Sequence, residues 1–244
     1  MAAPEAIRAA AAAGVVQLVT SGDTAAENSR GRELAERHPE VFFTPGWHPH
    51  NRRFPTAAER RELQALLAHP RAVALGEVGL DYHRAAGVAP WEPREQRRLL
   101  LEMLELAAEA GKPVVIHQRD AGPDLLEVLD SGPPLGVMLH CFSGGPEFAR
   151  EAVARGLLCS FAGNLTFSSA HDLREAALLV PPAQLLVETD APFLAPQPHR
   201  GRLCHPALVA VTAGWLAAHR GVCPETLAEW TSSTARAFFQ LPTP

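Results

Sequence analysis

Four short apolar runs along the chain each lead into a histidine or a carboxylate. They are Ala72–Gly76, which precedes Glu77; PVVIHQR (Pro113–Arg119), which contains His117; GVMLHCF (Gly136–Phe142), which contains His140; and LLVETDAP (Leu185–Pro192), which contains Asp190. Ala72–Gly76 has no polar side chain to turn toward water, so we expect both faces of this strand to be covered, as in a parallel sheet. The strand would then present Glu77 in the loop that follows it.

Strand-like and helix-like segments alternate along the whole chain. The expected strands are Val15–Thr20, Val41–Pro45, Ala72–Gly76, Pro113–Arg119, Gly136–Phe142, Leu157–Phe161 and Leu185–Pro192. The expected helices are Pro4–Ala13, Thr24–His38, Ala57–Ala68, Glu95–Ala110, Pro123–Asp130, Pro146–Arg155, His171–Leu179, His205–Arg220, Pro224–Thr231 and Thr234–Gln240, with a loop over Asp81–Pro93. Such alternation predicts parallel strands joined by right-handed crossovers.

This α/β pattern favours a (β/α)8 TIM barrel over an open doubly wound sheet. No GxGxxG or phosphate-binding loop follows the first strand, and the candidate polar residues are spread over several strand ends, which a barrel gathers around one mouth. Seven strands are expected where closure needs eight, and the sequence opens on a helix, so we expect the first strand to be missing from this chain. Residues 1–244 should form one domain.

Composition excludes several classes of protein. The net charge is −5, whereas non-specific nucleic-acid binders are strongly basic, so any polyanion must be held by a local basic patch. No apolar run approaches the ~18 residues that span a membrane. The four cysteines have no CxxC spacing and no signal peptide precedes them, so we expect a cytoplasmic protein with reduced thiols.

The polar residues at the four strand ends predict a metal site. Glu77, His117, His140 and Asp190 offer oxygen and nitrogen ligands that suit Zn, Mn or Mg, and a carboxylate can bridge two ions. Taken singly, a buried histidine is more often bonded to a backbone carbonyl, and a lone glutamate is more often an ion-pair partner. Four such residues at four parallel strand ends favour a shared site.

Other groups near these strand ends could hold an anionic substrate. Arg119 follows His117 by two residues, and Arg200 and Arg202 flank Gly201 beyond Asp190; an arginine beside glycine can present its fork to a phosphate. The alternative is that these arginines are solvated loop residues. In the loop Gly46–His50 we expect Pro49 to keep the chain extended, with one of its two histidines facing the site and the other facing solvent.

The motifs GEVGLDY, PVVIHQRDA, HCFSGG, SFAGNLTF and LLVETDAPFLAPQPHRG, in this order, resemble the TatD family of metal-dependent deoxyribonucleases over about Pro4–Phe239. The resemblance implies two divalent ions, with Glu77 bridging them and His117 and His140 on the second. Asp190 would hold the first ion and orient the attacking water, so Glu77 and Asp190 would be the catalytic residues. His48 and Arg200 would lie at the substrate phosphate.

Two departures from that family pattern qualify the expectation. The His-x-His pair of the family's first strand does not occur before the opening helix, and Cys204 and His205 stand where the family has Asn and Glu. We therefore expect this chain to hold one ion well, at Glu77, His117 and His140.

The function expected is metal-dependent hydrolysis of DNA phosphodiester bonds, by an exonuclease acting on strand ends and without a stable protein partner. One alternative is a related hydrolase of another ester, such as D-aminoacyl-tRNA, since such barrels support several chemistries. Another is an inactive barrel that serves as a binding partner.

Overall fold

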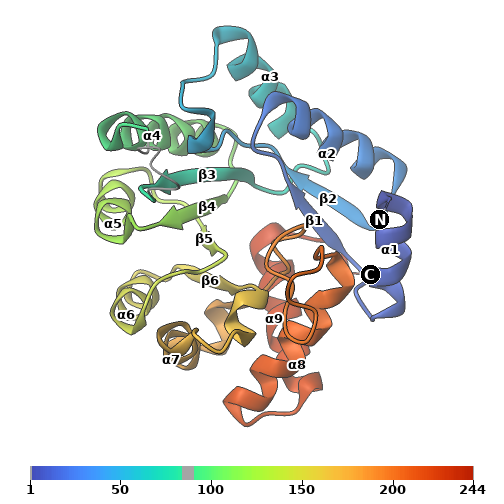
Figure 1. Ribbon diagram of the computed structural model, residues 1–244. Coiled ribbons are helices and arrows are strands. Elements are labelled where there is room, and N and C mark those ends of the chain that lie inside the picture. The colour runs from blue at the N-terminus through green and yellow to red at the C-terminus, as the bar shows by residue number, and fades with distance from the viewer. Residues whose placement is uncertain (1, 84–90, 244) are drawn as a thin grey trace. The chain divides into compact units, whose positions relative to one another are not determined.

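The computed structural model describes residues 2–83 and 91–243 (Figure 1). The chain separates into two compact units. The Glu77 unit comprises Val19–Leu139, and the His140 unit comprises Met1–Leu18 together with His140–Pro244. The single domain expected from chain length stays a prediction.

The Glu77 unit alternates strands and helices. Its strands are β1 (Leu18–Ser21), β2 (Val41–Thr44), β3 (Leu75–Asp81), β4 (Val114–Arg119) and β5 (Val137–His140). Strands β1 and β5 each extend one residue beyond the bounds of the unit. Its helices are α2 (Ala25–Arg37), the short 3-10 turn η1 (Pro49–Asn51), α3 (Ala57–Leu67), α4 (Pro93–Glu109) and α5 (Gly122–Ser131). Strand β1 pairs with β2, and β4 lies between β3 and β5. Helix α4 packs against β3 and against α5 (Figure 1).

Strand β3 and the residues before it form the centre of the Glu77 unit. An isolated parallel bridge joins Ala72 to Phe43 of β2, and from Leu75 onward the chain pairs in parallel with β4. The backbone N–H of Glu77 donates to the carbonyl of Gly22 at 2.9 Å. Because its backbone groups find partners on both sides, this segment is enclosed, which explains the unbroken apolar sequence before Glu77.

Local sequence signals set the helices of this unit. Thr56 accepts a hydrogen bond from the N–H of Glu59, whose carboxylate bonds back to Thr56, so α3 begins with a capping box. Helix α4 starts at Pro93 and then buries residues spaced three and four apart; its buried positions are Gln96, Leu99, Leu100, Met103, Leu104, Leu106 and Ala107. This stripe is the face that packs on β3.

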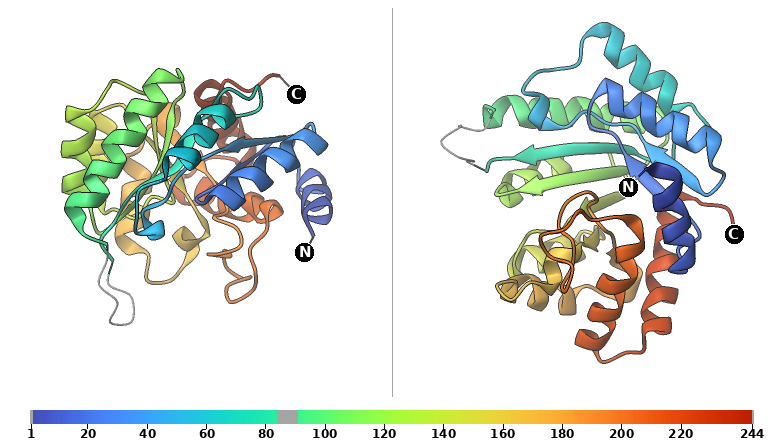
Figure 2. Two further views of the ribbon diagram at one scale, coloured as in Figure 1. Left: turned by 90° about the horizontal axis from the view of Figure 1, so that it is seen from above. Right: turned by 45° about the vertical axis from the view of Figure 1, so that its right-hand side comes forward.

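The His140 unit carries the N-terminal helix and the C-terminal elements. These are α1 (Ala3–Ala12), α6 (Pro146–Ala154), β6 (Leu158–Phe161), η2 (Gly163–Thr166), α7 (His171–Leu179), η3 (Pro182–Gln184), β7 (Leu185–Val187), η4 (Pro206–Leu208), α8 (Val209–Arg220) and α9 (Pro224–Phe239). Strands β6 and β7 are parallel, with Cys159 opposite Leu185 and Phe161 opposite Val187. Helices α8 and α9 lie side by side (Figure 2), and α6 packs against α7.

Several predicted boundaries were wrong. The strand expected over Val15–Thr20 begins only at Leu18, and the one expected over Ala72–Gly76 is β3, which begins at Leu75 and runs on to Asp81. Glu77 therefore lies inside a strand and not in a loop after it, because pairing with β4 continues beyond it. The expected loop over Asp81–Pro93 lies partly outside the described residues.

Two further differences concern the end of the chain and the loop after β2. The two helices predicted at the C-terminus form the single helix α9. The Thr231 hydroxyl donates to the Leu227 carbonyl at 3.0 Å, and the Thr234 hydroxyl donates to the Pro182 carbonyl at 3.1 Å. Because both hydroxyls are bonded in this way, these residues do not interrupt the helix. Pro49 begins η1, while His48 before it is extended as expected. Across the described ranges, no helix is long and apolar enough to cross a membrane.

Candidate metal centre

In the Glu77 unit, three side chains from different elements form one cluster. His48 comes from the loop after β2, Glu77 from β3 and His117 from β4. His117 Nδ1 lies 2.9 Å from Glu77 Oε1, and His48 Nε2 lies 3.5 Å from the same oxygen. One ligand atom from each residue lies within 4.8 Å of the others. This spacing allows Glu77 and His117 to share a cation.

Two glycines permit this close approach. Gly79 of β3 pairs with His117 and has φ of 149°; a Cβ there would lie 1.9 Å from the His117 carbonyl oxygen. A Cβ on Gly46 would lie 2.3 Å from the backbone nitrogen of Glu77. Any larger residue at either position would displace β4 or the His48 loop from β3.

His48 faces the cluster as a hydrogen-bond donor. Its Nδ1 accepts the backbone N–H of His50 at 3.1 Å, so the neutral ring carries its proton on Nε2, the atom nearest Glu77. Burial lowers the pKa of His48 by more than the hydrogen bond to Glu77 raises it. A nitrogen that carries a proton has no lone pair for a metal, so His48 is not a metal ligand in this tautomer. This fits the expected position of His48 beside the substrate. His50 is the more exposed of the pair and lies 3.2 Å from Asp23.

Asp81 contacts this cluster, and sequence reasoning missed it. Its Oδ2 lies 3.2 Å from His117 Nε2, the nitrogen that faces away from Glu77. Burial alone would lower the pKa of His117, but hydrogen bonds to Asp81 and Glu77 raise it. A carboxylate at Nε2 fixes the proton there and leaves the Nδ1 lone pair toward Glu77. The motif GEVGLDY contained the signal, because residues four apart on a strand share a face.

The His140 unit holds a second cluster of the same kind, made of His140, Glu188 and Asp190. His140 Nδ1 lies 2.8 Å from Glu188 Oε1, and His140 Nε2 lies 3.4 Å from Asp190 Oδ1. The backbone N–H of Cys141 also donates to Glu188 Oε1, at 3.1 Å. Strand β7 ends at Val187, so Asp190 lies past it, in the left-handed region with φ of 48°.

Glu188 was also missed by sequence reasoning. Its backbone N–H donates to Phe161 at 3.0 Å, which continues the pairing of β7 with β6 by one residue. Within the described part of the chain, Glu188 Oε2 is buried and has no hydrogen-bond partner. A buried carboxylate oxygen without a partner is costly unless a cation or a donor reaches it. The Glu-Thr-Asp spacing at the strand end was the available signal, since residues two apart share a face.

The donor sets of both clusters fit a divalent cation. Each combines imidazole nitrogen with carboxylate oxygen, as Zn and Mn sites do. The structure brings Glu77 together with His117, and His140 together with Asp190. The convergence of all four predicted ligands at one mouth stays a prediction.

The two predicted arginines lie at exposed positions. Arg119 ends β4 opposite Asp81 of β3. Burial would raise the pKa of the Asp81 carboxyl, but hydrogen bonds from His117 and His83 lower it, and the charge of Arg119 adds to that lowering. The guanidinium carbon of Arg200 lies 4.3 Å from the ring centroid of Phe167.

The four cysteines are free thiols. Burial raises the pKa of Cys159 to about 12 and also raises that of Cys204. The Cys204 thiol donates to the Thr189 carbonyl at 3.3 Å. High pKa values keep these two thiols protonated near neutral pH, so neither is a nucleophile.

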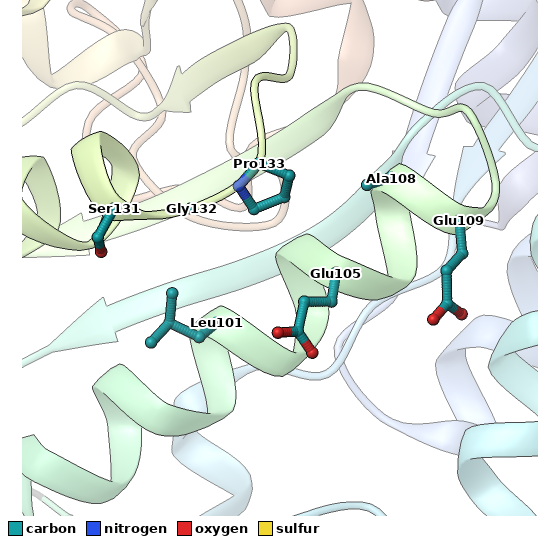
Figure 3. A pocket seen from close by; sticks show the side chains of 7 residues that line it. All are labelled: Leu101, Glu105, Ala108, Glu109, Ser131, Gly132 and Pro133. Carbon is teal, nitrogen blue, oxygen red and sulfur yellow. The ribbon is translucent and has the colours of Figure 1, made fainter.

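A hollow of about 520 Å3 in the Glu77 unit lies apart from this chemistry, between α4 and the segment after α5 (Figure 3). It is lined by Leu101, Glu105, Ala108, Glu109, Ser131, Gly132 and Pro133. Among these lining residues there is no histidine, cysteine or arginine, and none of the predicted site residues. Size alone therefore does not mark the functional site.

Comparison with known proteins places the chain in a family. The family model described as TatD related DNase matches residues 2–240. The chain belongs to this family. It is 42% identical to an uncharacterized metal-dependent hydrolase TatD from Mycobacterium tuberculosis, over 96% of this chain and 90% of that protein. It is 34% identical to a 3'-5' ssDNA/RNA exonuclease TatD from Salmonella typhimurium, over 94% of this chain and 90% of that one.

A solved structure supports the same assignment. The TatD homologue YJJV from Escherichia coli superposes with a TM-score of 0.90 at 27% identity, covering 98% of this chain and 92% of that one. The predicted α/β fold of the TIM-barrel type is confirmed by this likeness. The family assignment makes the protein a metal-dependent hydrolase, and therefore an enzyme. The cytoplasmic location stays a prediction.

Proposed function

We propose that this enzyme hydrolyses phosphodiester bonds of single-stranded DNA from a strand end, using a metal-activated water. The observation that carries the proposal is the pair of carboxylate–histidine clusters, Glu77 with His117 and His140 with Asp190. Their residues lie on parallel strands or just past a strand end, and barrel enzymes carry their chemistry at the carboxyl ends of such strands.

The ligands of two divalent ions, zinc, magnesium or manganese, would come from these clusters. Glu77, His117, His140 and Asp190 are the proposed donors, and Asp81 and Glu188 hold the two imidazoles at the opposite nitrogens. When bound, such ions acidify a water molecule and withdraw charge from a phosphoryl oxygen. Glu188 Oε2, buried and without a partner in the described residues, is available to join the donor set.

His48 is proposed to donate its Nε2 proton to an oxygen of the substrate phosphate. Its ring is held by the His50 N–H on one side, and its own backbone N–H donates to Asp23 at 3.1 Å. A neutral donor in a buried site stabilises charge that develops on phosphate without reorganising in the reaction. Arg119 and Arg200 are proposed to hold more distant phosphates, because both are exposed.

The choice of a single DNA strand rests on two supports. The Salmonella typhimurium relative carries the name ssDNA/RNA exonuclease and covers nearly the whole chain. The net charge of −5 disfavours a protein that wraps a duplex, whereas one strand end needs only a local patch.

The test is a reconstitution experiment on the full chain. The protein is treated with a chelator, reloaded with magnesium, manganese or zinc, and mixed with a 5'-labelled single strand, a blunt duplex and a D-aminoacyl-tRNA. We expect stepwise shortening of the single strand that depends on added metal, little cleavage of the duplex, and no hydrolysis of the aminoacyl ester.

The matched control is Glu77→Gln, which keeps the size of the side chain and removes its charge. Nuclease activity that survives in Glu77→Gln would come from a contaminant. If the wild-type protein cleaves no strand with any of the three metals, or hydrolyses only the aminoacyl ester, the proposal is wrong.

A further inference from the structure

The His140 unit contains a second feature that the metal clusters do not use, a hollow of about 420 Å3 beside the loop that follows Asp190. Its walls come from Phe167, at the end of η2, and from the segment between Pro192 and Leu203. The N–H of Phe193 donates to the Asp190 carbonyl at 2.8 Å, and the wall begins at Pro192, two residues from this proposed metal ligand. This volume lies in the lower range of small-ligand pockets, roughly 300–1,000 Å3.

The loop that builds the hollow is held at several points. The N–H of Cys204 donates to the Pro192 carbonyl at 2.9 Å, and the N–H of Gln197 donates to the Thr166 hydroxyl at 2.8 Å. Ala195, Cys204 and Leu208 are buried together beneath it. A loop tied at its ends and middle keeps its outward side chains in place before any ligand arrives, which lowers the entropy lost on binding.

Two large apolar side chains of this loop point into solvent. Phe193 is 67% exposed and Leu203 is 74% exposed, which makes them the most exposed large hydrophobic residues of the described chain. Both line the hollow. Apolar side chains gathered at a hollow, unlike apolar side chains scattered over a surface, mark a place where a ligand covers them.

The same hollow carries positive charge. Arg200 stacks over the Phe167 ring at 4.3 Å, and Arg202 lies two residues further along the loop. In the ranges that the structure describes, neither arginine makes an ion pair with a carboxylate. An arginine stacked on an aromatic ring keeps the edge of its fork free for a planar bidentate partner such as phosphate.

We propose that this hollow is a nucleotide subsite, in which one base of a single strand stacks on Phe193 and packs against Leu203 while Arg200 and Arg202 hold its phosphates. The inference rests on the proposed function and adds to it the part of the substrate that is recognised. The neighbouring ligand must offer both an apolar planar face and negative charge, and an unpaired nucleotide offers both. A paired base cannot stack here, because its faces are covered inside the duplex.

The test measures binding without cleavage. A 5'-fluorescein dT oligonucleotide is titrated with the full chain in EDTA, and fluorescence anisotropy reports the Kd. Phe193→Ala should weaken binding by about 5- to 100-fold, the range that loss of one base–aromatic stack produces. Phe193→Trp, which keeps a stacking surface, should bind like wild type. Because Phe193 is exposed, its truncation leaves no cavity, and unchanged thermal unfolding checks the fold.

Two controls separate stacking from charge. Leu178→Ala, a truncation of an exposed apolar residue on α7 that does not line the hollow, should leave the Kd unchanged. An oligonucleotide of equal length with abasic sites should bind wild type and Phe193→Ala equally weakly. Arg200→Gln should weaken binding of both strands and reduce the slope of log K against log salt by about 0.7.

The inference is overturned if Phe193→Ala binds the dT strand within twofold of wild type, if it loses as much affinity for the abasic strand, or if wild type binds no strand. Failure of the proposed function has a different signature. If the proposed function is wrong, base-dependent binding persists in EDTA but no metal supports cleavage. If the enzyme cleaves DNA but its binding does not depend on the bases, only the proposed subsite is refuted.

Discussion

Replacing Asp81 by asparagine should weaken metal binding at Glu77 and His117 while leaving the fold intact. Asp81 Oδ2 lies 3.2 Å from His117 Nε2, and its other oxygen accepts the N–H of His83 at 2.9 Å. The buried side chain of Gln96 bonds to both backbone groups of Asp81 at 2.8 Å, so the carboxylate is held in place independently of any metal. Its role is to keep the His117 proton on Nε2 and the lone pair on Nδ1.

The expected loss follows from this geometry. Removing a carboxylate that orients a metal-bound histidine lowers metal affinity by about 10- to 100-fold, which corresponds to about 1.4–2.7 kcal/mol. The Asp81 side chain is only partly buried, and asparagine retains an oxygen that can accept from Nε2, so Asp81→Asn should fall near the tenfold end. Asp81→Ala removes the acceptor and should approach the larger loss. Free energies of unfolding without metal should differ little between Asp81→Asn and wild type.

The measurement is competition for zinc or manganese against a chromophoric chelator. The matched control is Asp120→Asn, because Asp120 also lies 2.9 Å from a histidine, His83, but belongs to neither metal cluster. If Asp81→Asn binds metal within twofold of wild type, or if Asp120→Asn weakens binding as much, then Asp81 does not set the orientation of His117.

Three further predictions concern the second cluster and one helix cap. His140→Ala should abolish metal-dependent hydrolysis with an unchanged circular dichroism spectrum, and full activity with metal supplied would make His140 a structural residue. Glu188→Ala removes the carboxylate that lies 2.8 Å from His140 Nδ1 and accepts the Cys141 N–H at 3.1 Å, so urea unfolding of the metal-free protein should show a loss of about 1–3 kcal/mol; an unchanged midpoint would contradict this. Hydrogen bonds from Arg53 and Thr56 lower the pKa of Glu59 from 4.5 to about 2 in the folded protein. The resulting stability is therefore complete above pH 4.5 and disappears as pH falls toward 2, and Glu59→Gln should remove that part of the acid dependence, measured by thermal unfolding against pH.

The sequence by itself determined the order of the elements and the main ligand candidates. Apolar runs with period two or none predict strands, capping residues and amphipathic stripes predict helices, and both signals are local. Glu77, His117, His140 and Asp190 were found because each interrupts or follows an apolar strand, where a charged group is otherwise costly. The extents of β3 and α9 were not found, since strand pairing and tertiary hydrogen bonds override local breaks.

Only the tertiary structure decided which atoms of these residues face one another. Asp81 became a partner of His117 through the pairing of β3 with β4, and Glu188 became a partner of His140 just past the end of β7. Both contacts join residues that are far apart in the chain. The position of the proton on His48 follows from the backbone N–H of His50, which lies in a turn that the pattern of apolar residues does not predict. Phe193 and Leu203 are apolar, yet both are mostly exposed where they line the hollow of the His140 unit. The burial of a side chain and the direction of its hydrogen bonds depend on the whole fold, so a local sequence pattern cannot predict them.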